Sequence, residues 1–212
     1  MSRQPLGTVC GLAVPLVRPN LDTDVIIRID RMVSTSPSEL APFAFESLRT
    51  RSDGEPDPTV ALNDPRFRGA PILIGGSNFG CGSSREPAVW ALMGLGIRCV
   101  IAGSFGDIFE ANCHQNGVLP IVLPEPGLSA LAAIAANGIP VEVDLEAQQI
   151  NADGSAWPFT IGTMQKAALL EGLDDIDIAL RLSDDIEAWE RQDRRRRPWT
   201  SIPPGTSFDG RN

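Results

Sequence analysis

The stretch Ile72–Leu95, ILIGGSNFGCGSSREPAVWALMGL, combines an apolar run, a glycine-rich turn and a helix-like segment. Ile72–Ile74 has the character of a buried strand, and Pro87–Leu95 has that of a helix. The glycines between them allow backbone conformations that are closed to other residues. We therefore expect Gly75–Glu86 to form a strand-to-helix turn whose backbone can approach a ligand closely.

The chemistry of this turn favours an anion. The first N–H groups of a helix lack backbone acceptors, and the aligned peptide dipoles add roughly half a positive charge. Arg85 adds a full charge in a planar fork that fits a carboxylate. Either Ser83 or Ser84 can serve as N-cap, and Ser83 and Glu86 have capping-box spacing. We expect anion capture with a serine hydroxyl nearby; the alternative is an ordinary, well-capped turn.

Two better-known glycine loops do not fit the sequence. A phosphate-binding P-loop needs Gly-Lys-Ser/Thr after its second glycine, but Gly80 is followed by Cys-Gly-Ser. A dinucleotide fingerprint would need its third glycine at the position of Arg85. The turn therefore belongs to neither class.

Composition excludes several classes of function. The net charge of −9 and the pI near 4.6 argue against nucleic acid as a partner. The basic run Arg194–Arg197 follows an acidic stretch, which favours a solvated helix end. No apolar run is long enough for a membrane span, and the N-terminus is a poor secretory signal. We expect a cytoplasmic protein.

Cysteine and histidine usage limits metal chemistry on this chain. The four cysteines form no C-x-x-C pair and no disulfide framework. With His114 as the single histidine, we expect no metal centre held by this chain alone. An iron–sulfur cluster would need clustered thiolates from another polypeptide. A Ser-His-Asp relay could use only His114, for which a plain helix-end residue is the favoured interpretation.

The alternation of elements predicts an α/β fold. Expected strands cover 8–16, 25–29, 71–75, 98–102, 118–123 and 141–143, with a hairpin of 147–150 and 158–161. Expected helices cover 42–48, 85–95, 104–115, 128–137, 163–171 and 184–195, the third headed by Ser104 and Asp107. The βαβαβ run implies parallel strands joined by right-handed crossovers. Ligands bind at the carboxyl ends of such strands, where 75–85 and 103–104 fall.

We expect one domain over residues 1–198. Residues 33–70 are rich in Ser, Pro, Asp and Arg and exceed most connections in length, as lids and specificity loops do. Residues 199–212 form a tail that we expect to be disordered or to dock onto a partner.

Several separated motifs, in the right order, resemble the small subunits of 3-isopropylmalate dehydratase, which belong to the aconitase superfamily. The matching segments are 20–27 (NLDTDVII), 78–86 (NFGCGSSRE), 104–109 (SFGDIF), 116–120 (NGVLP) and 170–176 (LEGLDDI).

The resemblance implies a three-layer β/β/α swivelling domain that docks on a larger subunit. In this family the large subunit carries a four-iron, four-sulfur cluster, so no cofactor is expected on this chain. The implied activity is a hydro-lyase reaction of leucine biosynthesis. It converts 2-isopropylmalate to 3-isopropylmalate by dehydration and rehydration, and the substrate is a small dicarboxylic hydroxy-acid.

Carried over by position, Ser83 would be the base that removes a proton next to a carboxylate. Ser84 and the N–H groups of the turn would stabilise the resulting charge, and Arg85 would hold a carboxylate. Asp24 would line the same site, although a structural turn-capping role fits it equally well. Asp22 is expected to be structural, and Cys81 to be a small turn residue rather than a nucleophile.

Departures from the family pattern concern the substrate. Pro87 stands where relatives have His, and Arg28–Arg31 stand where they have Pro followed by Lys. A Thr-Gly-Phe loop of relatives is not evident in 33–48. These changes fit a paralogue acting on another hydroxy-diacid of the methylmalate or citraconate type, since modest pocket changes redirect specificity. A non-catalytic anion-binding module and an acidic interaction protein are further alternatives.

Overall fold

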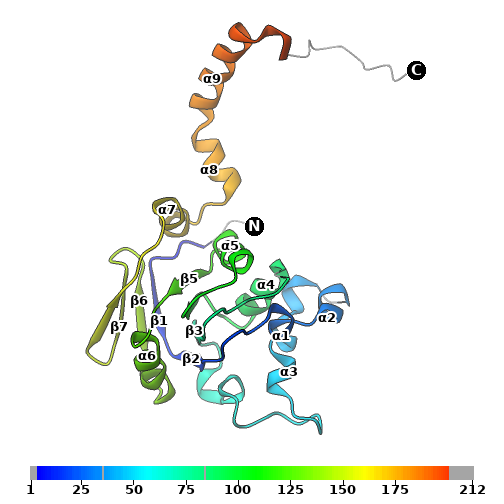
Figure 1. The fold of residues 1–212 in the computed structure, drawn as a ribbon, viewed down its shortest axis with the longest axis vertical. Coiled ribbons are helices and arrows are strands. Elements are labelled where there is room, and N and C mark those ends of the chain that lie inside the picture. The colour runs from blue at the N-terminus through cyan, green and yellow to red at the C-terminus, as the bar shows by residue number, and fades with distance from the viewer. Residues whose placement is uncertain (1–3, 35, 84, 201–212) are drawn as a thin grey trace. The chain divides into compact units, whose positions relative to one another are not determined.

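The computed structural model describes residues 4–34, 36–83 and 85–200 (Figure 1). The chain divides into two units, residues 1–173 and 174–212. The first unit contains both sheets, whereas the described part of the second unit is helical.

A four-stranded parallel sheet forms the middle layer of the first unit. Its strands lie in the order β2 (Ala13–Leu16), β3 (Ile72–Gly75), β4 (Cys99–Ala102) and β5 (Leu119–Val122). Every residue of β3 and β4 is buried, as their apolar sequences require. Pro15 and Pro120 lie in the two edge strands, where a missing N–H is tolerated. The predicted βαβαβ core is confirmed.

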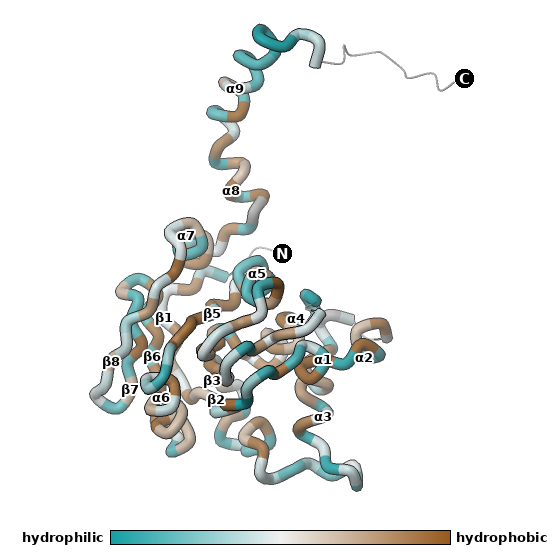
Figure 2. The backbone as a smooth tube through the Cα atoms, in the orientation of Figure 1, coloured by the Kyte–Doolittle hydropathy of each residue, from teal (hydrophilic) through white to brown (hydrophobic). Residues whose placement is uncertain are grey.

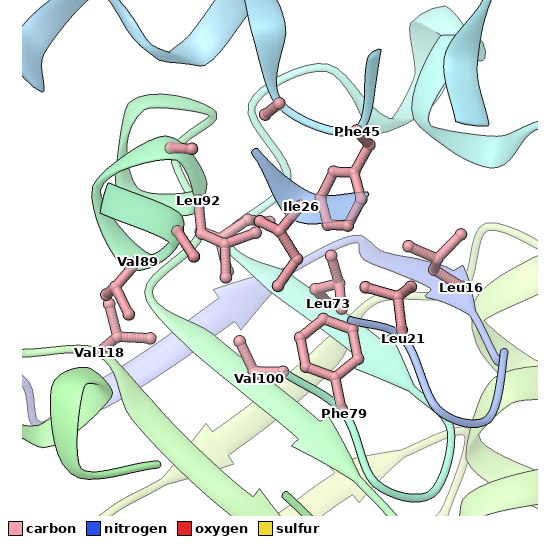
Figure 3. Close-up of a cluster of buried hydrophobic side chains, with 14 of the residues drawn as sticks. Leu16, Leu21, Ile26, Phe45, Leu73, Phe79, Val89, Leu92, Val100 and Val118 are labelled. Atoms are coloured by element: carbon pink, nitrogen blue, oxygen red, sulfur yellow. The ribbon is translucent and has the colours of Figure 1, made fainter. Parts of the chain in front are cut away.

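Helices cover one face of this sheet. α4 (Glu86–Gly94) and α5 (Asp107–Gln115) connect successive strands. Right-handed crossovers between strands in sequential order place both helices on the same side. Leu73 and Val100 point into this helical layer and pack with Val89 and Leu92 of α4 (Figure 3).

A second sheet covers the opposite face of the parallel sheet. It is antiparallel, in the order β1 (Thr8–Gly11), β6 (Val141–Asp144), β7 (Gln149–Ala152) and β8 (Ser155–Pro158). Ile72, Ile74 and Ile101 join its core, together with side chains of α6 (Gly127–Ala136) and α7 (Thr163–Glu171). Successive side chains of β3 therefore point into two different hydrophobic cores: Leu73 into the core under the helices, and Ile72 and Ile74 into the core between the two sheets. The result is the expected three-layer β/β/α arrangement.

Of the two early strand predictions, 8–16 is confirmed with a break, and 25–29 was wrong. Residues 8–16 form two strands in different sheets, with Gly11 and Leu12 at the crossing. The expected strand 25–29 is replaced by α1 (Thr23–Ile26) and the start of α2 (Ile29–Ser34). Its apolar residues suggested a strand, but Asp22 caps a helical turn by accepting the N–H of Asp24 at 2.7 Å.

Residues 36–70 pack against the body of the domain. They contain η1 (Pro37–Glu39), η2 (Ala41–Phe43), α3 (Glu46–Arg49), η3 (Ala61–Asn63) and η4 (Pro65–Phe67). Leu40, Phe45 and Phe67 are buried in the helical core, and Phe45 lies beside Ile26 in Figure 3. The expected helix 42–48 is thus split between η2 and α3. A role of this segment in specificity stays a prediction.

The predicted hairpin is confirmed, but both strands lie closer to the turn than expected, at 149–152 and 155–158 instead of 147–150 and 158–161. Only Asp153 and Gly154 lie between β7 and β8, and both have positive φ angles, 48° and 74°. An Asp-Gly pair favours this two-residue turn because both positions need left-handed backbone.

The second unit contains α8 (Asp175–Arg181), α9 (Ser183–Arg196) and η5 (Pro198–Thr200). α9 is hydrophilic along most of its length (Figure 2), and Arg194–Arg196 form its exposed last turn, as expected of a solvated helix end. Of the expected tail, residues 201–212 lie outside the described residues. None of the described helices is long and apolar enough to cross a membrane.

Candidate functional site

Three loops meet at the carboxyl edge of the parallel sheet. They follow β2, β3 and β4, and the turn after β3 lies between the other two. On one side, the Asn20 N–H donates to Ser77 O at 2.9 Å, and the Gly80 N–H donates to Leu21 O at 2.7 Å. The Thr23 N–H donates to Cys81 O at 3.0 Å, and Asp22 and Cys81 form a parallel bridge. The segment 20–27 and the turn therefore run in the same direction at this point.

The loop after β4 holds the other side of the turn. The Phe79 N–H donates to Ser104 O, and the Gly106 N–H donates to Phe79 O, both at 2.9 Å. Ser104 was expected to head the following helix with Asp107, and this was wrong. α5 begins at Asp107 with Gly106 as N-cap, and the Ser104 hydroxyl instead accepts the Asn78 N–H at 2.8 Å.

Close packing explains two glycines of the turn. Gly80 has a φ of +71°, and a Cβ there would collide with the ring of Phe109. Gly82 has a φ of +86°, and a Cβ there would collide with the carboxylate of Asp22. Both positions need left-handed backbone and lack room for a side chain.

Three phenylalanines anchor the base of the turn. The rings of Phe79 and Phe109 meet edge to face with centroids 5.5 Å apart, and Phe79 and Phe105 do so at 6.4 Å. Phe79 is fully buried below the turn (Figure 3). The base of the turn is therefore anchored in the core, whereas its later residues, Gly82 and Ser83, are exposed.

Ser83 and Arg85 are both exposed at the start of α4. Arg85 is the N-cap, so the expected cap at Ser83 and its capping box with Glu86 were wrong. Glu86 instead accepts a hydrogen bond from Asn116 Nδ2 at 3.0 Å. Ser84, the third residue expected here, lies outside the described residues.

Within the part of the chain that the structure describes, Arg85 carries a positive charge at this helix end and Glu86 is the acidic residue of the first turn. Arg85 has no ion pair there, and its side chain makes no capping hydrogen bond. Its positive charge adds to the positive end of the α4 dipole. A cation placed there is unfavourable until an anion binds, which is the electrostatic character expected of a carboxylate site.

Asp22 and Asp24 lie beside the turn in different roles. Asp22 is the N-cap of α1 and packs against Gly82, which confirms its structural interpretation. Asp24 is not the capping residue; it is exposed in the first turn of α1, and its carboxylate makes no hydrogen bond or ion pair to a described residue. Its place in a substrate site stays a prediction.

Cys81 and His114 lie on different elements. Cys81 is half-buried within the turn. His114 lies in the last turn of α5, where burial lowers the pKa of its imidazole. Its Nδ1 atom has no partner among the described residues. Over the same residues, no group of three His, Cys, Asp or Glu side chains could hold a metal ion.

The contact between Asn20 and Asn78 was not predicted. Asn78 Nδ2 donates to Asn20 Oδ1 at 2.8 Å, across 58 positions of sequence. Both residues have left-handed backbone, with φ angles of 53° and 55°. The residue type alone could have indicated the left-handed backbone at these two positions, because Asn adopts this conformation more readily than most other non-glycine residues.

Comparisons with known proteins agree with this geometry. The family model of the aconitase C-terminal domain matches residues 6–126. The 3-isopropylmalate dehydratase small subunit of Rhodospirillum centenum is 48% identical over 192 residues, covering 89% of this chain and 95% of that protein. The 3-isopropylmalate dehydratase small subunit of Cupriavidus necator is 47% identical over 202 residues, covering 92% of this chain and 97% of that protein.

A solved structure shares the fold. The crystal structure of a 3-isopropylmalate dehydratase from Methanocaldococcus jannaschii superposes with a TM-score of 0.62 at 26% sequence identity. The match covers 86% of this chain and 99% of that chain.

Proposed function

The chain belongs to the family of 3-isopropylmalate dehydratase small subunits, and on that premise we propose that it supplies a serine base and a carboxylate-binding arginine to a hydro-lyase. The site is completed by a large subunit that carries a four-iron, four-sulfur cluster. Together they convert 2-isopropylmalate to 3-isopropylmalate in the cytoplasm, as a step of leucine biosynthesis.

One observation carries the proposal. An exposed serine and an arginine without an ion pair to a described residue lie at the N-terminal end of α4, on a turn held between two other loops. Arg85 can hold a substrate carboxylate through two parallel N–H donors, which fixes the orientation of the acid. Pro87 has no N–H and the Ala88 N–H donates to Arg85 O at 3.0 Å, which leaves the Glu86 N–H as a backbone donor at the same end of the helix.

Ser83 would carry the proton transfer. A serine hydroxyl is a weak base unless its ionised form is stabilised, and nearby positive charge and oriented N–H donors provide that stabilisation. In the dehydration, Ser83 Oγ takes the proton from the carbon next to the carboxylate. In the rehydration it gives a proton back, so the residue ends each turnover unchanged. Ser84 would assist as a further donor, and Asp24 would line the site.

The partner would supply the other half of the chemistry. When bound, its cluster supplies the Lewis acid that draws off the substrate hydroxyl group. The described residues of this chain contain no metal-binding group of their own, which is compatible with a cluster held by the large subunit.

A second substrate is favoured by one local difference from the relatives. Arg28 pairs with Asp30 at 3.0 Å, and Arg31 pairs with Glu46 at 2.7 Å, in the segment where the family has Pro and Lys. Both guanidinium groups are therefore engaged within the chain. Together with Pro87 in the first turn of α4, these departures from the family pattern are the basis of the alternative, a paralogue acting on another small hydroxy-diacid of the methylmalate or citraconate type.

Reconstitution tests the proposal. We expect the isolated chain to be inactive and, with its large subunit, to interconvert 2- and 3-isopropylmalate; methylmalate and citraconate should be assayed in parallel. Activity with methylmalate or citraconate, and none with the isopropylmalates, would support the alternative that the chain is a paralogue with another substrate. A stable complex with no hydration of any of these acids would contradict a catalytic role.

A further inference from the structure

We propose that Asn20, Asn78 and Ser104 form a loop clamp that positions the glycine turn for catalysis. Asn78 connects the three loops: its side chain donates to Asn20 Oδ1, and its backbone N–H donates to Ser104 Oγ, each at 2.8 Å. The three residues are positioning residues, because they act through the turn rather than on substrate. The inference rests on the proposed role of Ser83.

The clamp lies on the exposed stretch just before the turn enters the core at Phe79. Phe79 is fully buried, whereas Asn78 and the two residues that it contacts are exposed. An exposed hydrogen bond adds little to the free energy of folding, because water competes for both partners. Stability alone therefore does not explain two asparagines that are held in left-handed conformations.

The turn needs such a clamp because of its own composition. Gly80 and Gly82 have the greatest backbone freedom of any residue type, and they separate Phe79 from Ser83. The carboxylate of Asp22 packs against Gly82 on one side. On the other side, the clamp holds Asn78 next to the buried Phe79, so the stretch from Gly80 to Gly82 is held at both ends. Small displacements of a reacting group cost much of the rate.

Glycine substitutions test the clamp without straining the backbone. Asn78→Gly and Asn20→Gly keep the left-handed conformation and remove the amides. In the complex with the large subunit, we expect each variant to lower kcat about 10- to 100-fold and to leave KM within about threefold. The double variant should be no slower than either single variant, because the two amides act through one contact.

Asn151→Ala is the matched control. Asn151 is another asparagine with a hydrogen bond between side chains, to Glu142 Oε1 at 3.2 Å, on the antiparallel sheet. We expect kcat and KM of this variant to equal those of the unaltered complex.

Amide hydrogen exchange separates failure of the clamp from failure of the proposed function. In the free chain, peptides covering 76–83 should exchange faster in both glycine variants and at the normal rate in Asn151→Ala. Asn78→Asp tolerates the same backbone and can accept from the Asn20 amide, so it should recover slow exchange, while its negative charge raises KM. Normal exchange in 76–83 for both glycine variants would overturn the clamp, whatever the substrate.

Discussion

Arg85 shows how one residue determines the chemistry of the turn. It is the N-cap of α4, a position that ordinarily holds Ser, Thr, Asp or Asn. A cation there opposes the helix dipole, so the residue is costly unless an anion compensates it. We propose that this anion is a substrate carboxylate.

Arg85→Lys keeps the charge and removes the planar fork. We expect KM for the diacid to rise about 10- to 100-fold, with a smaller effect on kcat, because a lysine holds a carboxylate without fixing its orientation. Steady-state kinetics of the reconstituted enzyme measure this. Arg68→Lys, at an exposed arginine elsewhere in the domain, is the control and should change neither constant.

At Gly80, the turn is constrained by close packing against Phe109. Gly80→Ala combines a left-handed backbone with a collision against Phe109, and we expect it to lower the free energy of unfolding by about 3 kcal/mol. Gly154→Ala is the control. Gly154 has a similar φ of +74° but nothing within 4 Å of the added Cβ, so about 1–2 kcal/mol is expected. Equal losses in urea denaturation would contradict the packing argument.

At the scale of elements, the predictable parts were those with a strong local pattern. The buried runs at β3, β4 and β5 and the helices between them were predicted because each is continuously apolar or clearly bounded. The α7 helix was predicted to the residue. The Asp-Gly pair placed the hairpin turn.

The failures arose where distant contacts decided the local structure. Val25 and its apolar neighbours have the sequence pattern of a strand. In the folded chain they form a helical turn, because Asp22 caps that turn beside Gly82. Ser104 has the sequence of a helix cap but bonds to Asn78, which is distant in sequence. The meeting of the loops after β3 and β4 followed from the rule for parallel strands, whereas the contact between Asn20 and Asn78 required the folded chain.

His114 makes α5 sensitive to acid. Burial lowers the pKa of its imidazole in the folded state, so the unfolded chain takes up this proton first as the pH falls through about 6.5. The free energy of unfolding is therefore preserved above that pH and falls below it. The aspartates with a lowered pKa, such as Asp30 and Asp64, titrate at lower pH.

Denaturation of His114→Gln at two pH values tests this. Between pH 7.5 and 5.5, the variant should lose less of its free energy of unfolding than the unaltered chain. Parallel losses in the two proteins would show that another group is responsible.

At the scale of the molecule, both hydrophobic cores lie within the first unit. The buried residues of the two clusters all precede position 174 among the described residues. We therefore expect the chain truncated after Leu173 to fold, with a melting temperature within about 3 °C of the full chain. Loss of cooperative melting in the truncated protein would contradict this division.

The acidic character of the whole chain contrasts with the positive charge of Arg85 at the start of α4. A net charge of −9 disfavours anionic partners, so the positive potential at the start of α4 is local. The molecule concentrates that potential on one turn at one edge of the parallel sheet. A docked large subunit would close the turn off from water and strengthen the charge interactions there.

The most direct test compares Ser83→Ala with Ser129→Ala, an exposed serine in the first turn of α6, after reconstitution with the large subunit. The account predicts that Ser83→Ala forms the complex normally and lowers kcat about 10³-fold or more, while Ser129→Ala retains full turnover. A Ser83→Ala complex that turns over the diacid at the normal rate would contradict the claim that Ser83 is the base.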